Sequence, residues 1–387
     1  MSSGDHPGKW NSESERLGVK VDGLSLRNPF LVASGPPTSN ANVIGKAFDE
    51  GWAGAVTKTT LLDHRKIRNV SPRYARWRDS GGRMVGWENI ELISDRPFAD
   101  WLDDFRRLKD RYPERVVIAS VMEEANRDAW AEVIGRSLEA GVDGIELNLS
   151  CPHGLPERRM GSAMGQDPEL LAEVCGWAAA CRDGRPMWAK LTPNVTDIAA
   201  MGKIALDAGC TGVSAINTIL SVMRIDLETL RPEPSVEGYS TAGGYSGTAV
   251  RPIALRMCME LGLMMTERSG DQAGVLSAMG GVETGEDAAQ YLLAGASTVQ
   301  VCTGVMIHGY DMVQPMCAGL RSFMVRHGFE SIEAFRGRAL PWLTSHSHLV
   351  QLQEDARAQR GKPAIEVARD ADWRGDRIVE QSGLLSG

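Results

Sequence analysis

The chain has 387 residues, of which 43% are hydrophobic and 24% are charged. This composition excludes a mostly disordered or fibrous protein, and the length suits one large α/β barrel or two or three average domains. The 42 basic and 50 acidic residues give a formal net charge of −8. Nucleic-acid-binding proteins normally have a basic excess, so we expect no nucleic-acid partner. The apolar runs are shorter than the roughly 20 residues of a membrane span, so we expect no membrane partner either.

The start of the chain and the number of cysteines favour a reducing compartment inside the cell. No apolar stretch follows the polar N-terminal residues, which predicts a protein without a signal peptide, located in the cytoplasm. The seven cysteines are an odd number, which suits a reducing compartment without disulfides. No two of them have C-x-x-C spacing, so we expect neither an iron–sulfur cluster nor a structural zinc site, and no bound metal.

Short apolar segments alternate with longer segments of helical periodicity along the chain. Most apolar segments are continuously hydrophobic, as parallel strands buried on both faces are. The predicted strands are residues 30–34, 53–58, 116–121, 144–149, 187–191, 212–217, 274–279 and 298–301. The predicted helices between and after them are residues 41–50, 98–111, 127–140, 168–181, 197–208, 252–261, 286–294 and 311–327. This alternation predicts an α/β fold, a (β/α)8 TIM barrel.

A doubly wound parallel sheet is the rival architecture. It would carry a glycine-rich phosphate loop directly after its first strand. Here the first predicted strand leads into Ala33-Ser34-Gly35-Pro36-Pro37, which is not a G-x-G-x-x-G loop. The barrel is therefore favoured.

We predict three parts in the chain. Residues 1–20 form an N-terminal arm, residues 21–329 form the barrel, and residues 330–387 form a C-terminal extension that is helical or partly disordered. The extension is charged towards its end and has few large apolar clusters. Two connections, residues 59–97 and 219–251, exceed the usual loop length and are expected to be binding loops or lids.

Reactive side chains gather at the C-terminal ends of the predicted strands, where barrel enzymes carry their active sites. Lys58 and Lys190 each end an apolar run, which favours cations held against an anionic ligand; side chains that reach out to solvent are the alternative. Cys151 follows a polar Asn-x-Ser segment and precedes a proline, so it is a candidate acid, base or nucleophile. A small buried apolar side chain is the alternative role for this thiol.

Glycines and amides extend this set. Gly280 and Gly281 follow the seventh predicted strand, and Cys302 and Thr303 follow the eighth. Backbone N–H groups at these two strand ends often bind phosphate in barrels, whereas a tight turn is the alternative. Converging side-chain amides suit a neutral planar ligand with amide edges, although turn capping is the alternative for each one. The amides near the strand ends are Asn89, Asn148, Asn194 and Asn217.

Several longer motifs occur in order over roughly residues 20–325. They include NPFLVASGPPTS at residues 28–39, LNLSCPHGLPERRMGSAMGQDPEL at 147–170, AKLTPNVTDI at 189–198 and GYSGTAVRPIALR at 244–256. By these motifs the chain resembles the dihydropyrimidine dehydrogenase family, within the dihydroorotate dehydrogenase superfamily of flavin barrels.

The resemblance implies a bound FMN and a pyrimidine-like cyclic amide as substrate. It implies that hydride moves between the flavin N5 and C6 of a 5,6-dihydropyrimidine while Cys151 exchanges a proton at C5, and that Lys190 stabilises the reduced flavin. The implied FMN-binding residues are Ala33, Ser34, Lys58, Thr59, Lys190, Gly247, Gly280, Gly281, Cys302 and Thr303. The implied substrate-binding residues are Asn89, Glu91, Asn148, Ser150, Asn217 and Thr218.

The best-known members of this family carry ferredoxin-like domains or an FAD/nicotinamide module, and this sequence has neither. We therefore expect a separate NAD(P)H-dependent reductase subunit or another electron carrier as partner. Flavin barrels often associate, so we also expect a homo-oligomer.

Three alternative functions are open to this sequence. A dihydroorotate dehydrogenase would use the same flavin and cysteine. The orotate carboxylate, however, would require hydrogen-bond donors or cations, and Glu88 and Glu91 are carboxylates themselves. A tRNA-reducing flavin barrel would need a basic surface, which the net charge of −8 disfavours. A non-catalytic barrel subunit of a larger complex is disfavoured because the sequence keeps Lys58, Cys151 and Lys190 together.

Overall fold

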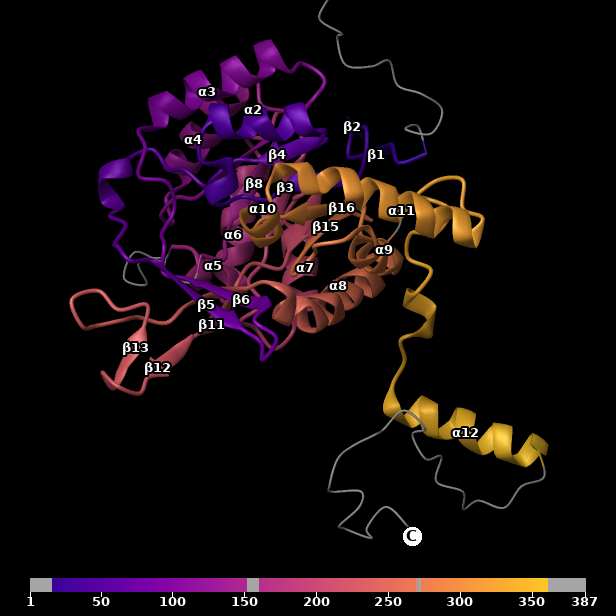
Figure 1. The fold of residues 1–387 in the computed structure, drawn as a ribbon. Coiled ribbons are helices and arrows are strands. Elements are labelled where there is room, and N and C mark those ends of the chain that lie inside the picture. Colours follow the sequence, from indigo (N-terminus) through magenta and orange to yellow (C-terminus); the bar gives the residue numbers. More distant parts are fainter. Residues whose placement is uncertain (1–15, 152–159, 269, 271–272, 361–387) are drawn as a thin grey trace, which may run out of the picture. The chain divides into compact units, whose positions relative to one another are not determined.

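Eight parallel strands close into a barrel in the first of two compact units (Figure 1). The computed structural model describes residues 16–151, 160–268, 270 and 273–360. The strands follow one another around the ring in chain order, so the predicted (β/α)8 barrel is confirmed and the doubly wound sheet is excluded. These strands are β3 (Phe30–Val32), β4 (Gly54–Val56), β7 (Val116–Val121), β8 (Gly144–Asn148), β9 (Met187–Lys190), β10 (Gly212–Ala215), β15 (Val275–Met279) and β16 (Thr298–Val301).

The barrel strands are buried on both faces. Every residue of β7 is buried, and its neighbours pair with it in parallel register, Gly54 with Val116 and Gly144 with Ile118. Side chains on one face fill the barrel, and those on the other face pack against the helices. Burial of this apolar surface stabilises the fold by about 25 cal/mol per Å². This two-sided burial explains why the strand sequences are continuously apolar.

A ring of helices covers the barrel (Figure 1). Side-chain caps mark where some of them begin: Asn40 accepts hydrogen bonds from the backbone at the start of α2, and Thr284 forms a capping box with Asp287 in α9. Trp101 and Phe105, four residues apart, face the core from α3. The covering helices are α2 (Ala41–Glu50), α3 (Phe98–Arg111), α4 (Arg127–Glu139), α6 (Pro168–Ala179), α7 (Ile198–Asp207), α8 (Arg251–Thr266), α9 (Gly285–Leu293) and α11 (Val313–His327).

The two long connections carry a second sheet, which the sequence did not predict. Its four antiparallel strands lie in the order β11 (Ile219–Ser221), β14 (Gly243–Ser246), β6 (Met84–Asn89) and β5 (Tyr74–Arg78). Two further pairs of short strands form hairpins, β1 (Val19–Val21) with β2 (Leu24–Leu26) and β12 (Arg224–Asp226) with β13 (Arg231–Glu233). The connections are thus built parts of the fold and bring two distant segments of the chain together.

The barrel unit extends to Leu340, beyond the predicted boundary at residue 329. Ile332 and Phe335 are fully buried in its core, which is why the segment belongs to the barrel. The second unit begins at residue 341 and contains α12 (His346–Arg360). Residues 1–15 of the predicted arm and 361–387 of the predicted extension lie outside the described residues. In the part of the chain that the structure describes, no helix has the length and apolarity to cross a membrane.

Candidate active site

A cavity of about 950 Å³, its open mouth included, lies where the C-terminal ends of the barrel strands meet β6 and β14. Most of the residues predicted for the site are on its wall. The predicted residues that line it are Ala33, Ser34, Asn89, Glu91, Lys190, Asn217, Thr218, Gly247, Gly280, Gly281, Cys302 and Thr303. These predicted residues, which are scattered along the sequence, therefore lie together around one cavity.

Part of the wall is made of backbone. Gly247, Gly280 and Gly281 have φ values of 98°, 142° and 66°, which favour glycine. A Cβ atom at Gly281 would lie 2.6 Å from the carbonyl oxygen of Gly247, so a side chain has no room there. The hydroxyls of Ser246 and Thr303 are 2.8 Å apart on the same wall. Exposed backbone with two hydroxyls suits an anionic group such as a phosphate.

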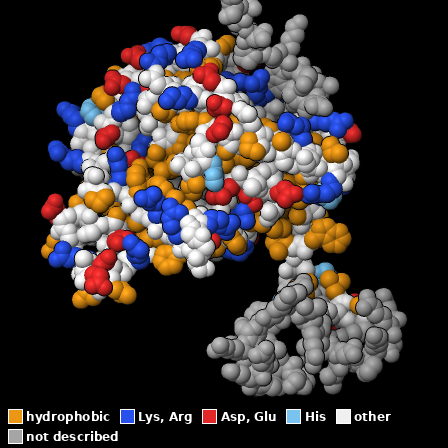
Figure 2. Space-filling view, viewed as in Figure 1, with side chains coloured by type: hydrophobic (Ala, Val, Ile, Leu, Met, Phe, Trp, Pro, Cys, Tyr) orange, Lys and Arg blue, Asp and Glu red, His pale blue; other side chains and the backbone are white. Residues whose placement is uncertain are grey.

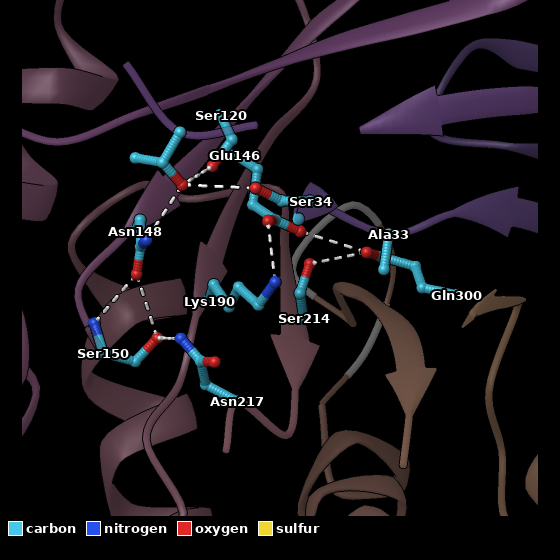
Figure 3. Close-up of polar contacts among 12 residues, drawn as sticks. Ala33, Ser34, Ser120, Glu146, Asn148, Ser150, Lys190, Ser214, Asn217 and Gln300 are labelled. Carbon is cyan, nitrogen blue, oxygen red and sulfur yellow. Dashed lines mark hydrogen bonds and ion pairs between the residues drawn. The ribbon is translucent and has the colours of Figure 1, made fainter. Parts of the chain in front are cut away.

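A buried ion pair lies at the base of the cavity (Figure 3). The Nζ atom of Lys190, at the end of β9, is 3.3 Å from Oε1 of Glu146 in β8. Gln300 of β16 donates a hydrogen bond from Nε2 to the other carboxylate oxygen of Glu146 at 3.0 Å. Lys190 and Gln300 line the cavity, so this base offers an ammonium group and an amide to a ligand.

A chain of hydroxyls and amides runs along one side of the cavity (Figure 3). The Ser34 hydroxyl is 3.2 Å from that of Thr59, and Asn148 donates to the same Thr59 oxygen at 2.9 Å. Asn148 in turn accepts from the Ser150 hydroxyl at 3.2 Å, and Asn217 donates to Ser150 at 2.6 Å. Five predicted site residues are thereby joined, with Thr59, Asn148 and Ser150 placed behind the wall.

Glu91 gathers three donors at the edge of the cavity. Lys58 lies 2.6 Å and Arg73 2.8 Å from its Oε1 atom, and the Tyr74 hydroxyl donates to Oε2 at 2.8 Å. Burial, followed by the charge of Glu91, raises the pKa of Tyr74, which keeps the phenol protonated. The Lys58 ammonium is thus held against a carboxylate of the protein itself, while Glu91 and Tyr74 face the cavity.

The structure places Cys151 beside the cavity rather than on its wall. The residue is 7% exposed and packs in a small apolar cluster with Met122 and Met160. It follows β8 closely, and its backbone carbonyl accepts a hydrogen bond from the Ser162 amide at 2.9 Å. The other predicted cysteine, Cys302, lines the cavity, and burial raises the pKa of its thiol to about 11.

Several residues of the site were not predicted from the sequence. Tyr74, Trp87 and Tyr245 line the cavity from the second sheet, which was not predicted. Glu146 and Gln300 lie inside barrel strands rather than at their ends. A signal for these two existed, because each interrupts a buried apolar strand with a polar side chain.

A family model described as dihydroorotate dehydrogenase matches residues 16–324 of the chain. The chain belongs to the dihydroorotate dehydrogenase family. Members of this family are flavin-dependent oxidoreductases. The crystal structure of dihydroorotate dehydrogenase from Eimeria tenella in complex with ferulenol shares the fold, with a TM-score of 0.69 and 20% identity over 86% of this chain and 90% of that one.

Curated members of the family support the resemblance to dihydropyrimidine dehydrogenases. Dihydropyrimidine dehydrogenase (NADP(+)), chloroplastic, of Arabidopsis thaliana is 54% identical over 96% of this chain and 88% of that protein. The NAD-dependent dihydropyrimidine dehydrogenase subunit PreA of Escherichia coli K12 is 39% identical over 84% and 76%. The catalytic subunit of dihydroorotate dehydrogenase B (NAD(+)) of Pyrococcus abyssi is 34% identical over 84% and 99%. The resemblance predicted from the motifs is confirmed.

Proposed function

We propose that the protein is an FMN-dependent oxidoreductase that interconverts a 5,6-dihydropyrimidine and its unsaturated form. The observation that carries the proposal is the make-up of one cavity, which combines a glycine-built wall, a buried lysine at its base and amide side chains beside them. Two relatives named as dihydropyrimidine dehydrogenases, at 54% and 39% identity, support the choice of substrate class.

The donor set of the cavity fits FMN. The backbone at Gly247, Gly280 and Gly281, with the hydroxyls of Ser246 and Thr303, would hold the phosphate. Lys190 and Gln300 would hold the flavin ring from the base of the cavity. When bound, FMN supplies the chemistry of hydride transfer.

The remaining steps belong to side chains of the protein. Asn89, Asn217 and Thr218 would orient the substrate through its amide edges, because a carboxamide both donates and accepts hydrogen bonds. The Lys190 ammonium would stabilise negative charge that develops on the flavin ring during reduction. The thiol of Cys151 would exchange the proton at C5 of the pyrimidine substrate.

The electrons have to be exchanged with another molecule. Among the described residues, no group of three or more histidine, cysteine or acidic side chains is arranged to hold a metal ion. We propose a separate reductase subunit or electron carrier as the partner that exchanges these electrons, and one relative is itself named as a subunit. The homo-oligomer stays a prediction. The cytoplasmic location also stays a prediction, because the Arabidopsis relative is named as chloroplastic.

An anaerobic titration tests the proposal. The purified protein is loaded with FMN and mixed with dihydrouracil, dihydrothymine or dihydroorotate while the flavin absorbance is followed. We expect the first two compounds to bleach the flavin and dihydroorotate to leave it oxidised. A protein that cannot be loaded with FMN would refute the proposal. Bleaching by dihydroorotate alone would favour the rival dehydrogenase, and bound flavin that no compound bleaches would favour the non-catalytic subunit.

A further inference from the structure

A fully buried carboxylate stands behind the cavity lysine. Glu146 is 0% exposed and occupies the middle of β8, between the apolar side chains of Ile145 and Leu147. Removing a carboxylate from water is costly unless a cation and hydrogen-bond donors compensate for the lost hydration. The position of Glu146 inside the barrel is therefore explained by the groups around it.

Side chains from five neighbouring strands form one polar cluster that contains Glu146 and Gln300 (Figure 3). Its Oε1 atom faces the Lys190 ammonium at 3.3 Å, and its Oε2 atom accepts from Gln300 Nε2 at 3.0 Å. The same Gln300 nitrogen lies 3.0 Å from the Ser277 hydroxyl and 3.3 Å from that of Ser214. Because Gln300 is tied to two further strands, the carboxylate is fixed rather than able to follow the lysine.

The cluster is not saturated with hydrogen bonds. Within the described part of the chain, Oε1 of Gln300 is buried and has no hydrogen-bond partner, and Oε1 of Glu146 has only the Lys190 ammonium, at 3.3 Å. Lys190 and Gln300 both line the cavity, whereas Glu146 lies behind them. An ion pair that served stability alone would be expected to satisfy its oxygens within the protein. Gln300, which lines the cavity, instead keeps an amide oxygen that no group in the described part of the chain satisfies.

We propose that Glu146 is a positioning residue, which holds the Lys190 ammonium at the base of the cavity and through it sets the reduction potential of the bound flavin. The inference rests on the proposed function, because it requires FMN in this cavity. A lysine side chain is long and flexible, so a fixed anion is needed to keep its charge in one place. Reduction adds negative charge to the flavin, and a localised cation favours the reduced form.

A double-mutant cycle on the FMN-loaded protein tests this role. The variants are Glu146→Gln, Lys190→Met and the double variant, and the measurement is the midpoint potential of the flavin against a reference dye. In the wild-type background, we expect Glu146→Gln to lower the equilibrium constant for flavin reduction by about tenfold, because the Lys190 charge is no longer held in place. In the Lys190→Met background, we expect the same substitution to have no effect, since Glu146 would act through the lysine.

Glu123→Gln is the matched control, since Glu123 is another buried carboxylate, 3% exposed, that accepts a hydrogen bond from the Leu62 amide outside the cavity. It should leave the potential unchanged. If Glu146→Gln does not fold, Glu146→Asp keeps the charge but withdraws it from Lys190, and it should still shift the potential.

An unchanged potential in a Glu146 variant that binds FMN would overturn the inference alone. The same shift in both backgrounds would also overturn it, because Glu146 would then act without Lys190. A wild-type protein that binds no FMN would instead refute the proposed function.

Discussion

Cys151 is the proposed proton-exchanging residue, yet the structure places it beside the cavity and not on its wall. Its thiol packs among apolar side chains, including Leu61 and Ile93, next to the barrel end from which the substrate would be reached. Catalytic contacts often form only in the substrate complex, so the position without substrate does not decide the role of an acid or base. A substitution that removes the thiol but keeps the cavity distinguishes an acid–base role of Cys151 from the role of a buried apolar side chain.

We expect Cys151→Ala to lower turnover by about 10²–10⁴-fold, the usual loss when a general acid or base is removed. FMN content should stay at the wild-type level, because Cys151 does not line the cavity. Steady-state kinetics and the flavin-to-protein ratio measure the two effects. Cys317→Ala, in the covering helix α11, is the control and should keep full turnover. Wild-type turnover in Cys151→Ala would remove this residue from the mechanism.

Among single residues, those at strand ends could be predicted from the sequence. Lys190 and Gly281 stand out because an apolar run stops beside them, and a barrel gathers such ends at one face. Glu146 could not be assigned in the same way. Its role depends on which strand lies beside β8, and that register follows from barrel closure rather than from local sequence. The ion pair of Lys58 with Glu91 was missed because Glu91 follows β6, a strand of the second sheet that the sequence did not predict.

At the scale of elements, continuous burial made the barrel strands predictable. β7 and β16 begin and end where the sequence predicts, and every residue of both strands is buried. The second sheet gave no such signal. Its strands β6 and β14 are joined by pairs such as Asn89 with Gly244, far apart in sequence, and many of their residues are polar or only partly buried. Tertiary pairing, rather than local preference, produces these strands.

The turn after β15 offers a test of the proposed phosphate wall. In Gly281→Ala, the new Cβ atom would lie 2.6 Å from the Gly247 carbonyl oxygen, so the backbone has to shift. We expect FMN to bind at least about tenfold more weakly, which corresponds to about 1.4 kcal/mol. Fluorescence titration of the apoprotein with FMN measures the change.

Gly23→Ala is the matched control for this turn. Gly23 has a similar φ of 76°, but nothing lies within 4 Å of a Cβ atom there. The control carries the same backbone strain and should keep its affinity for FMN. Equal affinities in wild type and Gly281→Ala would show that the turn is not part of the FMN site.

At the scale of the whole molecule, one buried acid links folding to pH. Glu88 is 0% exposed in β6, next to the cavity residue Asn89. The backbone at Gly243 and Met223 and the Ser221 side chain offer its carboxylate hydrogen bonds that favour the ionised form, but burial has the larger effect. Burial raises the pKa of this carboxyl from 4.5 to about 7. The folded protein therefore keeps a proton on Glu88 over a pH range in which the unfolded chain has released it.

This difference in proton binding fixes the sign of the pH dependence. Between pH 4.5 and about 7 the folded state binds more protons at Glu88 than the unfolded state does, so this residue lowers the free energy of unfolding as the pH rises. In Glu88→Gln the neutral amide cannot titrate. We expect the variant to lose less stability than the wild type over this range and to be the more stable protein at about pH 8. Urea unfolding across the range, at constant FMN concentration, measures both curves. The exposed Glu132→Gln should keep the wild-type slope, and the same slope in Glu88→Gln would contradict the assignment.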